Sequence, residues 1–166
     1  MGKVVLARID ERLIHGQVMM TLSQMSGVNS IFVVDDVVAN DPFMRDLYRS
    51  AGGRTGQQTI VVPVERCKFY WDEFNFKEYQ CILLTKNVST MHELITHGIP
   101  MPELNVGGIA KKTDDDKQVT NSVHLNKDDA LKLKDLRDNH GVNVYFQATP
   151  AAPKTSLDEV LKMFDL

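Results

Sequence analysis

The segment VVLARIDERLIHGQVMM, residues 4–20, decides the fold and contains the first candidate site. It begins with an apolar run typical of a buried strand, continues through a charged loop with one histidine, His15, and ends in an apolar run with helical spacing. A strand, a loop and a helix in this order begin a βα unit, the building block of parallel sheets. A histidine among arginines and carboxylates, just before a helix, indicates a reactive loop that binds an anion.

The same alternation of short apolar runs and helically spaced segments continues along nearly the whole chain. Strands are predicted at 4–7, 31–34, 59–62, 81–84, 104–106, 122–125 and 142–146, and helices at 18–27, 40–49, 89–97, 127–139 and from 156 onward. We therefore expect one α/β domain over residues 1–166, an open, mostly parallel twisted sheet with helices on both faces, of the Rossmann-like class. The region 54–76 gives no clear prediction beyond its strand, because its aromatic residues obscure the spacing.

Composition excludes several classes of protein. With 166 residues, 43% hydrophobic and 25% charged, the chain has the balance of an ordinary globular domain. A formal net charge of -3 provides no basic field for nucleic acid. The chain carries neither a signal-peptide pattern nor an apolar run of the ~18 residues that span a bilayer, so a cytoplasmic location is expected. Cys67 and Cys81 have no metal-ligand spacing and are expected to be reduced and structural.

Several candidate residues follow predicted strands. Ligands of open parallel sheets bind beyond the carboxyl ends of the strands. The loop that carries His15, the pair Asp35-Asp36 and the pair Gly107-Gly108 all follow such strands, so we expect them to meet at one edge of the sheet. Glycine permits a backbone with positive φ or a close approach to a ligand.

The chemistry that suits this loop is phosphoryl binding or transfer. Arg8 and Arg12 can donate charge-assisted hydrogen bonds to phosphate oxygens. The predicted helix after Gly16, starting near Gln17, directs free N–H groups toward the loop. A neutral imidazole is nucleophilic near physiological pH, so His15 can carry a phosphoryl group.

The chain contains neither G-x-G-x-x-G after its first strand nor G-x-x-x-x-G-K-[ST]. Dinucleotide-binding and P-loop sites therefore lack their phosphate loops. No cofactor and no metal are expected.

Residues 8–18, RIDERLIHGQV, resemble the active-site signature of the IIB component of the mannose/fructose/sorbose family of bacterial phosphotransferase systems. Other segments resemble family blocks in the same order: 34–36 (VDD) with 39–44 (ANDPFM), 104–108 (LNVGG) and the strand that starts at 141 (GV). The resemblance is weaker between Arg54 and Trp71, where the run Gly56-Gln57-Gln58 looks less typical.

The resemblance implies a function and a set of partners. His15 would be phosphorylated, at Nδ1, by the phosphohistidine of a IIA component, and would pass the group to a sugar bound by the membrane components IIC and IID. The chain would thus be a protein-Nπ-phosphohistidine–sugar phosphotransferase that meets the membrane only through its partners. Because the membrane component forms the sugar pocket, this chain leaves mannose, fructose, sorbose and amino sugars all open, and association into homo-oligomers is open too.

The resemblance also implies roles for individual residues, each with a plainer alternative. Arg8 and Arg12 would neutralise phosphate, or be solvated charges in exposed salt bridges. Asp10 would organise the loop, or only cap it. Asp35 and Asp36 would border the site, or cap the next helix. Gly107 and Gly108 would admit phosphate, or only form a tight turn.

Two other functions compete with phosphoryl transfer. A non-catalytic Rossmann-like module would hold a small anion or a nucleotide at the same edge without covalent chemistry. A metal-dependent enzyme would use Asp10, His15 and Asp35, although these residues show no recognised ligand spacing.

Overall fold

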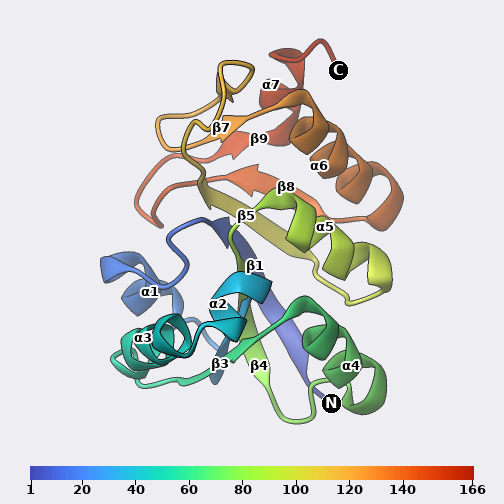
Figure 1. Ribbon diagram of the computed structural model, residues 1–166. Helices are drawn as coiled ribbons and strands as arrows, with labels where there is room; N and C mark the ends of the chain where they lie inside the picture. The colour runs from blue at the N-terminus through green and yellow to red at the C-terminus, as the bar shows by residue number, and fades with distance from the viewer.

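Seven strands form the main sheet of the structure, a computed structural model that describes residues 1–166 (Figure 1). Their order is β3-β2-β4-β1-β5-β8-β9, and all neighbours are parallel except β8 and β9. The strands are β1 (Lys3–Asp10), β2 (Ser30–Val34), β3 (Gln58–Val62), β4 (Gln80–Thr85), β5 (Glu103–Gly108), β8 (Asn143–Phe146) and β9 (Thr155–Ser156). The predicted open, mostly parallel sheet is confirmed, and β1 lies at its centre between β4 and β5.

Helices cover both faces of the sheet, as predicted (Figure 1). One face carries α1 (Gly16–Leu22), α2 (Asp36–Asn40) and α3 (Pro42–Gly53). The other carries α4 (Val64–Phe74), α5 (Val88–His97), α6 (Lys127–His140) and α7 (Leu157–Lys162). No helix has both the length and the apolar composition that crossing a bilayer requires.

Local capping explains where several helices begin and end. Asp41 accepts hydrogen bonds from the backbone N–H groups of Phe43 and Met44, and Pro42 occupies the first turn of α3. Asn126 caps α6 in the same way, and Gly141, with φ of 68°, ends it.

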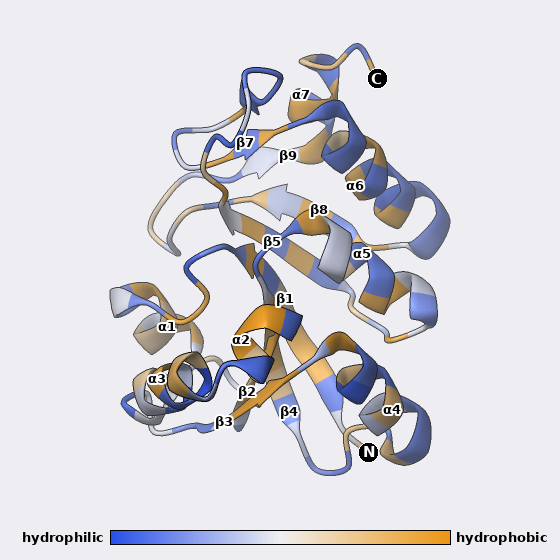
Figure 2. Cartoon of the chain, in the orientation of Figure 1, coloured by the Kyte–Doolittle hydropathy of each residue, from blue (hydrophilic) through white to orange (hydrophobic).

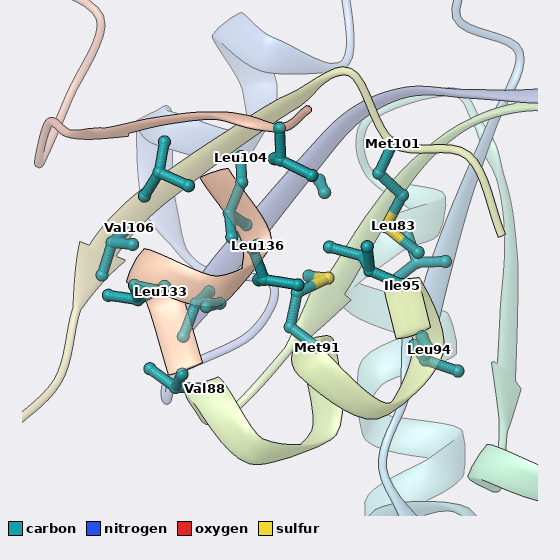
Figure 3. Close-up of a cluster of buried hydrophobic side chains, with 14 of the residues drawn as sticks. Leu83, Val88, Met91, Leu94, Ile95, Met101, Leu104, Val106, Leu133 and Leu136 are labelled. Carbon is teal, nitrogen blue, oxygen red and sulfur yellow. The ribbon is translucent and has the colours of Figure 1, made fainter. Parts of the chain in front are cut away.

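Two hydrophobic clusters hold the layers together, because alternate strand residues point to opposite faces. The larger cluster packs α5 and α6 against β4 and β5, and Figure 3 shows its side chains interleaved between these elements. The smaller cluster packs α1, α2 and α3 against the other face. Figure 2 shows apolar residues concentrated in the strands and a largely hydrophilic outer side on α6.

Three expectations need correction. The predicted strand 122–125 does not join the main sheet: only β7 (His124–Leu125) forms, antiparallel to β6 (Lys117–Gln118) in a separate two-stranded sheet. Its apolar alternation arises because Val123 and Leu125 are buried in the larger cluster. The first helix ends at Leu22 instead of 27. The apolar spacing of residues 18–27 also suggested a buried face, yet Met20 and Met25 are 39% and 38% exposed.

Burial on α6 can be tested with two leucines of the same helix. Leu133→Ala removes a fully buried side chain and should lower the free energy of unfolding by about 2–5 kcal/mol. Leu131→Ala, at a position that is 44% exposed, should change it by less than about 0.5 kcal/mol. Urea denaturation of the two variants measures the difference, and equal losses would contradict the packing described for α6.

Candidate functional site

The site starts within β1 itself. A register shift between Val4 and Leu6 resets the strand, after which Leu6, Arg8 and Asp10 alternate with Ala7 and Ile9. Ala7 and Ile9 enter the larger cluster, so the other three face the opposite side of the sheet. The predicted strand 4–7 was too short, because charged residues in a strand interior were assigned to a loop.

The carboxylate of Asp10 is the hub of the site and is fully buried. Its Oδ1 accepts from the backbone N–H and the Nε of Arg12, at 3.1 and 3.0 Å. Its Oδ2 accepts from Nη2 of Arg8 at 3.1 Å, Nη2 of Arg12 at 3.0 Å and Nε2 of His15 at 3.1 Å. One carboxylate therefore positions both arginines and the histidine.

Arg8 is 1% exposed, and its guanidinium is occupied by partners within the fold. Besides Asp10, it donates to Oδ1 of Asn105 and to the backbone carbonyls of Gln147 at 3.3 Å and Ala148 at 2.9 Å. It lies against β5 at Gly107, where the Cβ of any other residue would collide with the guanidinium. Arg8 thus ties β1 to the segment that follows β8.

The charges of this group depend on one another. Burial alone would raise the pKa of Asp10, but hydrogen bonds from Arg12, the charge of Arg8 and the hydrogen bond of His15 hold that pKa below its ordinary value. Burial lowers the pKa of Arg8, against the opposing charge of Asp10. The hydrogen bond to Asp10 raises the pKa of Arg12, whose side chain is 54% exposed. Asp10 is therefore an ionised carboxylate between two guanidinium groups.

A tight turn brings His15 back to Asp10. The N–H of Leu13 donates to the carbonyl of Asp10 at 2.9 Å, and Leu13 takes a positive φ of 56° while fully buried. Non-glycine residues adopt this backbone rarely, and the burial of Leu13 in the smaller cluster offsets its cost. His15 is then the N-cap residue of α1, with its side chain 22% exposed.

The remaining predicted residues divide into two groups. Gly108 belongs to the site: its carbonyl accepts from the N–H of Glu11 at 3.0 Å, and a Cβ there would lie 3.1 Å from Nη2 of Arg12. Gly16, with φ of 50°, and Gln17 open α1 beside His15, and both are exposed.

The acidic pair after β2 does not join this group. Asp35 caps α2 by accepting from Val38 N at 2.9 Å, and Asp36 accepts from Val64 N at 2.8 Å. Neither Asp35 nor Asp36 contacts His15 or the arginines. The metal-dependent alternative needs Asp10, His15 and Asp35 around one ion, and the structure does not bring these three together.

Asn105 is a site residue that the sequence analysis did not single out. It is 3% exposed, holds Arg8 through Oδ1 and donates Nδ2 to the carbonyl of Gln147 at 3.0 Å. A polar residue inside the apolar run LNV was the available signal, because a buried amide needs hydrogen-bond partners.

Comparisons with known proteins match this fold and this order of residues. The family model described as "PTS system sorbose subfamily IIB component" matches residues 4–165. The sorbose-specific EIIB component of Klebsiella pneumoniae is 29% identical over 93% of both chains. The mannose-specific EIIAB component of Escherichia coli is 32% identical over 97% of this chain, which spans 47% of that longer protein.

Solved structures agree with these matches. The crystal structure of manxB from Thermoanaerobacter tengcongensis has a TM-score of 0.90 and 36% identity, covering 99% of this chain and 98% of that one. The IIBSor domain of the sorbose permease from Klebsiella pneumoniae has a TM-score of 0.87 and 29% identity, covering 96% and 97%.

The ionised state of Asp10 predicts how stability depends on pH. Its folded-state pKa is lowered, so its contribution is complete above the unfolded carboxyl pKa of about 3.9 and is lost as pH falls through the folded value. Asp10→Asn should cost about 3–5 kcal/mol at pH 7, because Arg8 stays buried without its counter-charge.

The difference between wild type and Asp10→Asn should narrow as the pH is lowered below about 4. Urea denaturation at a series of pH values measures it. Asp115→Asn, at an exposed position, is the control and should follow the wild type. A gap that stayed constant down to the lowest pH would rule out an ionised Asp10.

Proposed function

Because this chain belongs to the sorbose subfamily of phosphotransferase-system IIB components, we propose that His15 receives a phosphoryl group from the phosphohistidine of a IIA component and passes it to a sugar. As a family member the chain is a phosphotransferase that works in sugar transport with IIA and membrane IIC and IID components. The finer activity proposed is that of a protein-Nπ-phosphohistidine–sugar phosphotransferase. Its sugar would come from the classes that name its relatives, which include sorbose, N-acetylgalactosamine and fructose.

One contact supports the proposal most strongly, the 3.1 Å hydrogen bond between Nε2 of His15 and Oδ2 of Asp10. An ionised carboxylate accepts hydrogen bonds but donates none, so Nε2 carries the proton. In a neutral imidazole the other nitrogen, Nδ1, then keeps its lone pair. Asp10 thereby selects the tautomer in which Nδ1 is the nucleophile.

The proposed transfer follows from this tautomer. The Nδ1 lone pair attacks phosphorus, the phosphorus–nitrogen bond of the donor imidazole breaks, and its electron pair returns to the donor nitrogen. Positive charge develops on the His15 ring while Nε2–H remains hydrogen-bonded to Asp10, whose negative charge stabilises it. In the second step a sugar hydroxyl attacks the same phosphorus atom, the electron pair of the bond to Nδ1 returns to His15, and the hydroxyl proton passes to a base at the sugar site or to solvent.

The two arginines have different parts in this proposal. Arg12 is more than half exposed and adjoins His15 through Asp10, so its remaining N–H groups are able to meet the phosphoryl oxygens. Arg8 is enclosed by Asn105 and two backbone carbonyls. We assign phosphate neutralisation to Arg12 and the support of Asp10 to Arg8.

The decisive experiment is phosphoryl labelling. Incubation with phosphoenolpyruvate, the general phosphocarriers and a matching IIA component should produce an acid-labile, base-stable phosphohistidine. His15→Ala should abolish the label, whereas His97→Ala, at an exposed position on α5, should keep it. Label that persisted in His15→Ala would remove the assignment. Saturable anion binding without any label would favour the non-catalytic binding module.

Arg12 and Glu11 provide a paired test of the loop. Arg12→Ala should slow transfer from IIA by at least about tenfold, because it removes charge-assisted contacts to the phosphoryl group. Glu11 is bonded to Ala110 N and Lys112, away from His15, so Glu11→Ala should have a much smaller effect. Quench-flow measurement of single-turnover transfer distinguishes them, and equal rates would withdraw the role assigned to Arg12.

A further inference from the structure

His15 borders a cavity of about 310 Å³ whose lining reaches the end of α3 and does not include Asp10. Its walls come from the reactive loop, from α1 and from the residues that end α3, which lies beside α1 (Figure 1). Its lining includes His15, Gly16, Met20, Ala51, Arg54 and Thr55. Arg54 is the one basic side chain among the lining residues apart from His15.

In the unphosphorylated protein, the two arginines of residues 8–15 already bind partners within the fold. Arg8 is sequestered, and Arg12 gives both Nε and Nη2 to Asp10. A phosphoryl group adds a charge of about -1.5 to -2 near pH 7. Because Asp10 already accepts hydrogen bonds from both arginines, few of their N–H groups remain for the phosphoryl oxygens.

Arg54 is placed to supply a further cationic hydrogen-bond donor to this site. It is exposed, and none of the ion pairs in the chain includes it. A guanidinium offers a planar fork of donors that matches phosphate oxygens. Its charge is therefore free for a ligand of the cavity that it shares with His15.

Hydrogen bonds fix the backbone that carries Arg54 against α1. Gln57 donates Nε2 to the carbonyl of Ser23 at 2.8 Å, and Gln24 donates Nε2 to the carbonyl of Thr55 at 3.3 Å. Thr55 is itself buried and donates its hydroxyl to the carbonyl of Gly52 at 2.6 Å. These hydrogen bonds hold the residues that flank Arg54 beside the segment that ends α1.

We propose that Arg54 is a phosphoryl-binding residue of the His15 cavity, which holds the phosphoryl group on the side opposite Asp10. The inference rests on the proposed function, because the group it binds is the one carried by His15. Arg54 adds to Arg12 instead of replacing it: Arg12 adjoins the hub at Asp10, and Arg54 closes the far wall of the cavity.

Arg54→Gln tests the proposal, with Arg49→Gln as the control. Both substitutions remove one positive charge from an exposed arginine near the C-terminal end of α3, but Arg49 does not line the cavity. Arg54→Gln should slow single-turnover transfer from phosphorylated IIA about tenfold, the loss of about one charge-assisted hydrogen bond. Arg54→Lys should recover part of the rate, and Arg49→Gln should match the wild type.

A second readout separates binding from a structural effect. In ³¹P spectra of the phosphorylated protein, loss of a nearby cation should raise the pKa of the phosphoryl group in Arg54→Gln and leave it unchanged in Arg49→Gln. Gln57→Ala keeps the charge but releases one of the hydrogen bonds, so it should give a smaller change in the same direction. If the phosphoryl pKa of Gln57→Ala equals that of the wild type, Gln57 does not position Arg54.

The inference and the proposed function fail in different ways. If the wild type takes no label, the proposed function falls, and inorganic phosphate titrated into the unmodified protein still tests Arg54 through the ¹H–¹⁵N signals of residues 15–18. Weaker phosphate binding in Arg54→Gln than in Arg49→Gln supports the contact. The opposite case is a labelled wild type in which Arg54→Gln and Arg49→Gln agree in transfer rate, phosphoryl pKa and phosphate affinity. That result would overturn the role of Arg54 and leave the role of His15 intact.

Discussion

A single buried carboxylate organises the site around His15. Asp10 ends the central strand, and its two oxygens accept hydrogen bonds from Arg8, Arg12 and His15. Burying such a charge is costly unless it is paired and fully hydrogen-bonded, and here three cationic or polar groups meet that requirement. Strand geometry, loop shape and the tautomer of the imidazole all depend on the same carboxylate.

Much of the architecture could be predicted because apolar periodicity is local. Six of the seven predicted strands formed in the main sheet, the exception being 122–125. Asp41 before Pro42, and Gly141, are residue types typical of helix ends. The strand order was not predictable, since β1 pairs with β4 on one side and with β5 on the other, and both are far from β1 in the chain. Helix α4 was missed although Val64, Cys67 and Trp71 follow helical spacing, because its aromatic residues also favour strands.

For the site, residue types were predictable but their division of labour was not. The spacing of charges around His15 indicated an anion site, yet nothing local distinguished a sequestered Arg8 from an exposed Arg12. That difference comes from Asn105, Gly107 and the carbonyls after β8, which only the folded sheet brings to Arg8. Asp35 and Asp36 follow a strand, as site residues often do. Their carboxylates instead accept hydrogen bonds from the backbone N–H groups of Val38 and Val64, in the first turns of α2 and α4.

The left-handed backbone of Leu13 has a consequence for how the two partners meet this chain. Many functional loops change conformation when a partner binds. In this loop, a change in the backbone of Leu13 would take a fully buried side chain out of the smaller cluster. The loop therefore behaves as a rigid template. In the proposed relay, the adjustment that brings a donor and then an acceptor into line with His15 would fall to the surfaces of the other proteins, and one loop conformation would serve both transfers.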